Sequence, residues 1–223
     1  MNEILFASHI LIIVLFLLIA LRLGKNYLLA LVALLAILAN LFVIKQIDLF
    51  TKVVTSTDAY IVGAVLGQNL LQEYFGKKTS LKAIKITFFS MIFFLIMAKV
   101  HLLYIPSIFD NTQTSFQNIL TNSPRIIISS ITVFFIASRF DVIFFGFLKK
   151  IFKDKHLVFR MTLSSILTQL LDTILFTYLA LFGQAKSILD IILFSFIIKS
   201  LVIFIAAPFM KFSKTFFKKI NYE

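Results

Sequence analysis

Long apolar stretches fill almost the whole chain, and short polar segments separate them. A helix needs about 20 apolar residues to cross the ~30 Å hydrocarbon core of a bilayer. We therefore expect seven transmembrane helices, over Ile4–Leu21, Tyr27–Ile47, Asp58–Tyr74, Ile84–Ile105, Ile119–Leu148, Leu157–Phe182 and Ile188–Met210. This pattern predicts an all-α membrane protein whose single transmembrane domain covers residues 1–223.

Basic residues fall in every second connection between these stretches. The first, third and fifth loops and the C-terminal tail hold most of them, for example Arg22, Lys77, Lys149 and Lys211. Loops rich in Lys and Arg stay in the cytoplasm. We therefore expect the C-terminus in the cytoplasm and the N-terminus outside. Only an odd number of helices satisfies this alternation, which agrees with seven.

Composition and charge exclude several classes of protein. Hydrophobic residues make up 60% of the chain, too many for an ordinary soluble domain. The net charge of +12 does not indicate nucleic-acid binding, because the bases occupy loops of one parity, as membrane insertion requires. Cysteine is absent and the histidines are scattered, so we expect no metal site and no cofactor. Phosphate-binding glycine loops and hydrolase motifs are missing, so we expect no enzyme.

Ionisable side chains within the predicted helices mark candidate functional positions, since a charge at the centre of a spanning helix costs at least ~2.5–3.5 kcal/mol. Asp172 and Lys199 lie near the middle of the last two helices. These helices run antiparallel, so the two charges reach a similar depth and are natural counter-ions. Ser165, Gln169 and Asp172 recur at i, i+4 and i+7 and form one polar stripe. Asp172 is the strongest candidate for a functional role.

The third predicted helix carries amide and acidic side chains on one face. Asn69 and Glu73 are four residues apart and share that face. Glu73 lies near the predicted cytoplasmic end, where a role as an interfacial cap or a partner of Lys77 competes with a functional role. Gly63 and Gly67 form a small-residue pair that allows another helix to approach closely.

Four further polar positions lie in the second and fifth predicted helices. Asn40 stands deep in an apolar run, where it either joins helices or contacts a ligand. Arg125 is close to an outer helix end. Arg139 and Asp141 are too close in sequence to face each other on a helix, so each needs a partner from elsewhere. Polar residues on five helices together predict one shared cavity that binds a small polar solute.

Four stretches carry a family resemblance through their order and spacing. They are Ala39-Asn40 with Lys45 and Asp48, the run from Gln68 to Lys77, Pro124-Arg125-Ile126 with Ser129-Ser130 and Asp141, and the run from Arg160 through Ser164-Ser165, Gln169 and Asp172-Thr173 to Lys199 and Pro208. Over about Leu28 to Met210 the chain resembles the queuosine precursor transporter family, also called the vitamin uptake transporter family. Asn69 and Phe75 stand where that family usually has an aspartate and a tyrosine.

The resemblance implies a fold and a function. It implies a six-helix core over residues 26–223, similar to the substrate-binding subunits of energy-coupling-factor transporters, after one extra N-terminal helix in residues 1–25. It also implies import of 7-deazaguanine bases, such as queuine or its aminomethyl and cyano precursors, across the inner (cytoplasmic) membrane for queuosine modification of tRNA. Two alternatives stay open: a substrate-binding subunit for another vitamin or heterocycle, which needs a separate ATP-driven energising module, and a structural membrane protein. A homo-oligomer is a further possible partner arrangement.

The expected ligand chemistry selects a set of candidate residues. A carboxylate can accept the N1–H and 2-amino group of a deazaguanine, amide and basic side chains can donate to its carbonyl, and its flat ring can stack on Phe or Tyr. We expect Asp172 or Glu73 to accept at the base edge, with Lys199 as a counter-ion or second donor. The predicted substrate-binding residues are Asn40, Asn69, Glu73, Arg125, Gln169, Asp172 and Lys199.

Overall fold

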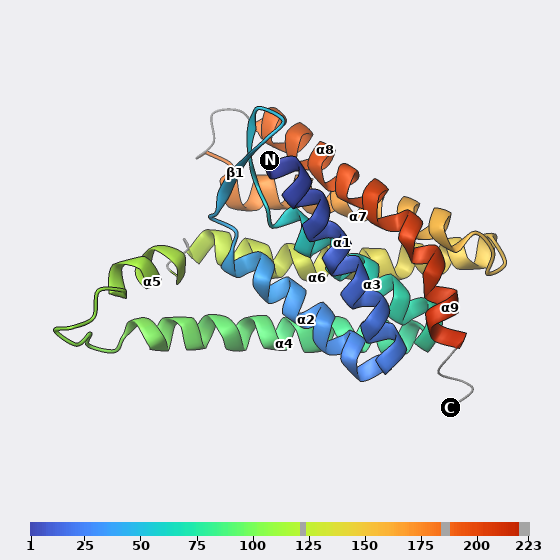
Figure 1. Ribbon diagram of the computed structural model, residues 1–223, viewed down its shortest axis with the longest axis horizontal. Coiled ribbons are helices and arrows are strands. Elements are labelled where there is room, and N and C mark those ends of the chain that lie inside the picture. The colour runs from blue at the N-terminus through green and yellow to red at the C-terminus, as the bar shows by residue number, and fades with distance from the viewer. Residues whose placement is uncertain (121–123, 184–187, 219–223) are drawn as a thin grey trace.

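The computed structural model describes residues 1–120, 124–183 and 188–218, and it is built almost entirely of helices (Figure 1). The elements are α1 (Asn2–Leu23), α2 (Lys25–Leu41), β1 (Gln46–Leu49), β2 (Lys52–Thr55), α3 (Asp58–Phe75), α4 (Lys77–Leu102), α5 (Gln113–Leu120), α6 (Pro124–Ile151), α7 (Leu157–Phe176) with a π-helical turn (Thr177–Leu181), α8 (Ile188–Ala206) with a 3₁₀ extension (Ala207–Phe212), and α9 (Ser213–Lys218).

Among the described residues, five helices are long and apolar enough to cross a membrane: α1, α4, α6, α7 with its π turn, and α8 with its extension. The predicted all-helical, multi-pass membrane fold is confirmed at this level. The remaining two long helices differ from them for separate reasons. Helix α2 has only 17 residues. Helix α3 has 18, but its polar stripe lowers its hydropathy, and nearly all of it is buried by other helices. The count of seven spans stays a prediction.

The predicted helix over Tyr27–Ile47 is wrong at its C-terminal end. Helix α2 stops at Leu41, and Gln46–Leu49 forms β1 of a hairpin with β2. The strands are antiparallel, with Leu49 opposite Lys52. The two turn residues, Phe50 and Thr51, have φ of 49° and 63°, as the hairpin turns that match the strand twist require. Polar residues alternating with apolar ones favour this strand over a helical end.

Two other predicted boundaries also change. Helix α4 begins at Lys77, about two turns before the expected Ile84. Its first turns are polar and basic, so a prediction based on apolar residues places the start of the helix too late. The single helix expected over Ile119–Leu148 is divided between the short α5, which ends at Leu120, and α6, which begins at Pro124. The connection between α4 and α5 is short, because α4 ends at Leu102 and α5 starts at Gln113.

Helix α3 lies at the centre of the bundle, in contact with α1, α2, α4, α6, α7 and α8. Its glycines allow the close approach that the sequence predicts. A Cβ on Gly67 would lie 2.7 Å from Val32 Cγ2 and 2.9 Å from Leu17 Cδ2, and one on Gly63 would lie 2.6 Å from Ile13 Cγ2. Small residues therefore let α1 and α2 pack directly against the α3 backbone.

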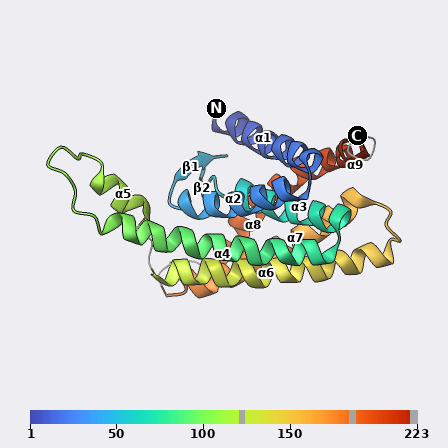
Figure 2. The ribbon, with the colours of Figure 1, turned by 90° about the horizontal axis from the view of Figure 1, so that it is seen from below.

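The two ends of the bundle differ in charge. The α1–α2, α3–α4 and α6–α7 connections and α9 lie at one end, while the N-terminus, the β-hairpin and α5 lie at the other (Figures 1 and 2). The first group carries the basic residues Arg22, Lys77, Lys149 and Lys211. The predicted alternation of basic and non-basic connections thus corresponds to opposite ends of the molecule.

Candidate functional site

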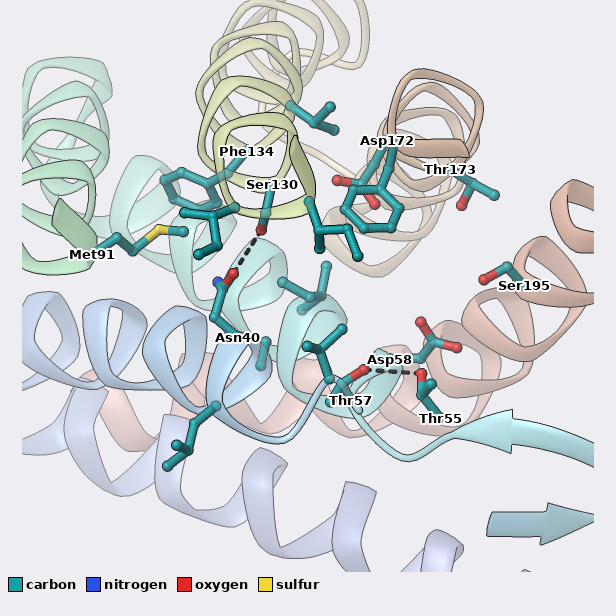
Figure 3. A pocket seen from close by; sticks show the side chains of 18 of the residues that line it. Asn40, Thr55, Thr57, Asp58, Met91, Ser130, Phe134, Asp172, Thr173 and Ser195 are labelled. Carbon is teal, nitrogen blue, oxygen red and sulfur yellow. Dashed lines mark hydrogen bonds between the residues drawn. The ribbon is translucent and has the colours of Figure 1, made fainter. Parts of the chain in front are cut away.

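A cavity of about 240 Å³ lies in the half of the bundle nearest the β-hairpin and α5. Its walls come from the C-terminal part of α2, the start of α3, the later turns of α4, the end of α5, the first turns of α6, the end of α7 and the middle of α8. Elements far apart in sequence therefore converge here, as Figure 3 shows. The volume is below the ~300–1,000 Å³ typical of sites for drug-sized ligands, so the cavity suits a small, compact solute.

An ion pair between α7 and α8 borders the cavity. Lys199 Nζ donates to Asp172 Oδ2 at 2.6 Å and to Thr173 Oγ1 at 3.1 Å. The Lys199 side chain is 8% exposed and the Asp172 side chain is 18% exposed, so the carboxylate keeps access to the cavity. The expectation that these residues are counter-ions at similar depth is confirmed.

Asp58 adds a second carboxylate and was not among the site residues predicted from the sequence. It begins α3, is 7% exposed, and lines the same cavity. It is close enough to interact electrostatically with both Lys199 and Asp172. An acidic residue at the start of a helix with several amide side chains was the available signal, but acidic residues are also common at an ordinary helix N-terminus. With Lys199 as the only Lys or Arg in the described lining, the formal charge of the cavity is negative.

Amide and hydroxyl groups occupy the opposite side (Figure 3). Ser130 Oγ donates to Asn40 Oδ1 at 2.7 Å, and Asn40 Nδ2 donates to the Ala36 carbonyl at 2.9 Å. Asn40 therefore joins α2 to α6 and also faces the cavity, so both alternatives left open for it are compatible with its position. Thr57, ahead of α3, and Ser195 of α8 add hydroxyls on the side of the cavity where Asp58 lies (Figure 3).

Most of the remaining lining is apolar. Phe134 of α6, Phe176 of α7 and Phe94 of α4 supply aromatic rings, and Met91 of α4 supplies flexible apolar surface. Flat apolar walls with a few polar groups are the usual composition of a small-molecule site. The arrangement can bind a planar solute through ring contacts and orient it through hydrogen bonds.

The other predicted site residues lie outside the cavity lining. Arg125 is exposed at the start of α6, and its Nε donates to the Leu179 carbonyl at 2.7 Å. Asn69 is fully buried between helices, where its Nδ2 donates to Ser165 Oγ at 3.4 Å. Gln169 is also buried, one turn from Asp172 along α7.

Glu73 lies at the basic end, away from the cavity. Its carboxylate accepts from Arg160 Nη1 at 3.0 Å and Nη2 at 2.9 Å, and Lys149 Nζ lies 3.2 Å away. Its partner is thus Arg160 of α7, from which 87 residues separate it, rather than the nearby Lys77. This bidentate pair joins α3 to α7 and is a structural contact in the state described.

The partner expected from elsewhere is present for Asp141, whereas Arg139 contacts a ring on its own helix, α6. The Arg139 guanidinium is exposed and lies 4.4 Å from the centroid of the Phe135 ring. Asp141 is fully buried, and Ser164 and Thr168 of α7 donate to its Oδ1 at 2.6 and 3.1 Å.

These features define a helical, multi-pass membrane protein with an internal, polar-centred cavity for a small solute, which is the general construction of a transporter. Residues 59–212 match the family model described as "Putative vitamin uptake transporter". The match covers more than half of the chain, and the chain belongs to this vitamin uptake transporter family, whose members are transporters and not enzymes. The resemblance found in the sequence is confirmed.

A curated relative agrees with this assignment. The chain is 28% identical over 189 residues to a Bacillus subtilis (strain 168) protein named "Probable queuosine precursor transporter", and the alignment covers 83% of this chain and 82% of the relative. No solved structure matches the chain.

Proposed function

We propose that this protein imports a 7-deazaguanine queuosine precursor, and that the cavity between α2, α3, α4, α6, α7 and α8 is its binding site. The Asp172–Lys199 pair, which opens into a cavity of about 240 Å³, is the observation that carries this proposal. It offers a carboxylate acceptor and an ammonium donor side by side, which complement the amine and carbonyl edge of a guanine-like base. The name of the Bacillus subtilis relative supports the same substrate class.

The proposed contacts follow from the position of each group. Asp172 accepts from the N1–H and 2-amino group, and Lys199 donates to the neighbouring carbonyl oxygen. Asn40 orients the opposite edge of the ring, and Phe134 and Phe176 pack on its faces. Of the residues expected from sequence, Asn69, Glu73, Arg125 and Gln169 do not line the cavity, and we assign them no contact with the base.

Charge within the cavity favours one group of precursors over another. Asp58 and Asp172 together exceed the single Lys199 by one negative charge. A ligand that carries an aliphatic ammonium group, such as the aminomethyl precursor or queuine, would offset this excess at Asp58. The cyano precursor lacks that charge, so we expect it to bind more weakly.

The proposed topology places the basic end in the cytoplasm of the cell, because Lys- and Arg-rich loops stay inside. The cavity then lies in the outer half of the inner membrane. Helices α2 and α3 complete seven spans with the five long helices, giving a six-helix core preceded by α1. This core is the part that we expect to be similar to energy-coupling-factor substrate-binding subunits.

Thermal unfolding with a ligand series tests the proposal. The purified protein would be heated with queuine, the aminomethyl and cyano precursors, guanine or riboflavin. Because the chain has no Trp and no Cys, circular dichroism is the suitable readout. A ligand at a hundredfold excess over its Kd stabilises the folded state by about 2.7 kcal/mol. We expect stabilisation by deazaguanines, abolished in Asp172→Asn and retained in the matched control Asp110→Asn, an exposed loop residue bonded to Thr112.

A response to riboflavin alone would contradict the deazaguanine assignment and point to another vitamin. Uptake in a transport-deficient host then separates two modes of action. Uptake by this chain alone supports an autonomous transporter, whereas uptake that requires a co-expressed ATPase module supports a substrate-binding subunit.

A further inference from the structure

Among the described residues, a buried carboxylate outside the cavity has no basic side chain within ion-pair distance. Asp141 of α6 is 0% exposed, between α3 and α7. The hydroxyls of Ser164 and Thr168 donate to Oδ1, and the Asn69 amide lies beside the carboxylate. In the described part of the chain, no Lys, Arg or His nitrogen lies within 4.0 Å of it, since none of the ion pairs includes Asp141.

Buried polar atoms without hydrogen-bond partners occur on α6 and on both helices that pack against it, α3 and α7. Asp141 Oδ2 and Asn69 Oδ1 are both buried and have no hydrogen-bond partner. Gln169, which follows Thr168 on α7 and is 1% exposed, has neither amide atom bonded. Buried polar atoms are nearly always bonded, so the unbonded oxygens of Asp141, Asn69 and Gln169 on these three adjoining helices indicate a position that suits a positively charged ligand.

The charged groups on the surrounding helices are committed elsewhere. On α7 and α8, Arg160 is bonded to Glu73 and Lys199 to Asp172. On α6 itself, Arg139 is exposed on a phenyl ring. On α4, which packs against α6, Lys82 and Lys85 are exposed. Glu73, the acidic group on α3 nearest in sequence to Asn69, is already paired.

We propose that Asp141, together with Asn69, Ser164, Thr168 and Gln169, binds a monovalent cation, either Na⁺ or H⁺, whose entry is coupled to transport. The site offers only oxygen ligands and a single negative charge. Hard alkali cations and protons suit such ligands, whereas transition metals prefer imidazole or thiolate groups. Among the described residues, no group of three or more His, Cys, Asp or Glu forms a metal site.

The site is placed to communicate with the cavity. Thr168, whose hydroxyl donates to Asp141, lies four residues before Asp172 on α7. This separation is a rise of about 6 Å along the helix axis. Gln169 lies between them. Binding a cation would draw α3 and α6 onto the same turn of α7 that carries the substrate-binding pair, so occupancy of one site changes the geometry of the other.

Stability of the purified protein without substrate tests this site, so a failure here is separate from a failure of the deazaguanine assignment. Apparent Tm would be measured by circular dichroism in NaCl, KCl and choline chloride of equal ionic strength, and in choline chloride from pH 5.5 to 8.5. A saturable rise in Na⁺ over K⁺ identifies sodium as the ligand. A rise as pH falls, without a sodium effect, identifies the proton.

The neutral isostere decides whether Asp141 is responsible. We expect Asp141→Asn to lose the sodium or pH dependence, while Asp110→Asn, with an exposed loop carboxylate, retains it. Should Asp141→Asn fail to fold, Thr168→Val keeps the carboxylate but removes one ligand hydroxyl, and we expect it to shift the midpoint of the dependence by severalfold or more. A wild type that is indifferent to both ions, or an unchanged dependence in the variant that folds, overturns the proposal.

Discussion

Removing Lys199 should destabilise the protein more than removing its partner Asp172. The two residues form one ion pair with Nζ and Oδ2 2.6 Å apart, yet the charges around them are unequal. In Asp172→Asn, Lys199 keeps Thr173 as a hydrogen-bond acceptor and Asp58 as a nearby carboxylate. In Lys199→Met, two carboxylates are left facing each other with no cation between them.

The structure sets the size of this difference. Breaking a buried ion pair from one side costs about 3–5 kcal/mol, and we expect Lys199→Met to fall in this range because the lysine side chain is 8% exposed. Losing a hydrogen bond to a charged group costs about 1.5–3 kcal/mol. Asp172→Asn should fall near or below that range, since the Asp172 side chain is 18% exposed. The double variant should recover about 0.5–3 kcal/mol relative to additivity.

Circular dichroism melts of the wild type, both single variants and the double variant measure these terms. At this chain length about 1 kcal/mol corresponds to a shift of 2–4 °C in Tm. Lys211→Met is a matched control, because Lys211 is exposed beside the Phe212 ring. Equal losses in the two single variants, or a larger loss in Asp172→Asn, would refute the argument that Asp58 makes the site asymmetric. The double variant should remain unable to bind the base even where its stability recovers.

Three further predictions concern other contacts. Arg160→Met should cost about 3–5 kcal/mol of stability, because the Arg160 side chain is fully buried against Glu73. Lys149→Met should cost less than about 1 kcal/mol, because the Lys149 side chain is 30% exposed. Similar losses of Tm in the two variants would show that burial does not set the strength of these ion pairs. Gly67→Leu should cost at least about 1–3 kcal/mol by overpacking α1 and α2, which the yield of monodisperse protein and its Tm would report. Asn40→Ala should lower Tm by only the equivalent of about 1 kcal/mol but should weaken ligand-induced stabilisation, and an undiminished ligand shift would remove this residue from the site.

Sequence periodicity was sufficient to predict the contact between Asp172 and Lys199. Both residues stand near the middle of consecutive apolar stretches, so depth along the antiparallel helices follows from counting residues. The same local arithmetic predicted that Gly63 and Gly67 share a face that packs closely. Such inferences need only the helix repeat and the direction of the chain.

Lateral contacts could not be predicted in this way. The partner of Glu73 is Arg160, 87 residues away, because α3 happens to pack beside α7 at that level. Asp58 lines the cavity only because the hairpin returns the chain to the end of α2. Side-chain packing across the bundle decides which helices are neighbours. Because the helices are apolar on all sides, the periodicity of the sequence does not indicate which helix packs against which.

The hairpin also shows why the end of the second predicted helix was wrong. Apolar content alone extended that helix to Ile47, although Gln46 and Asp48 flank Ile47 on both sides. Such alternation is the signal of a strand, but it is only four residues long and is continuous with an apolar helix. A window of about 20 residues, which membrane spans require, averages it away.

Helix α7 organises the polar groups of the protein into three levels. Asp172 lies at the cavity, Thr168 and Ser164 hold Asp141 at the next two turns, and Arg160 binds Glu73 nearest the basic end. Twelve residues separate the first level from the last, about 18 Å along the helix. On the import path that we propose, a solute leaving the cavity along α7 would pass the Asp141 level and then the bidentate Glu73–Arg160 contact before it reached the basic end. Since α3 and α6 supply the groups that face α7 at both levels, Asn69 with Asp141 and Glu73 with the Phe145 ring, we expect import to involve a movement of α7 relative to these two helices.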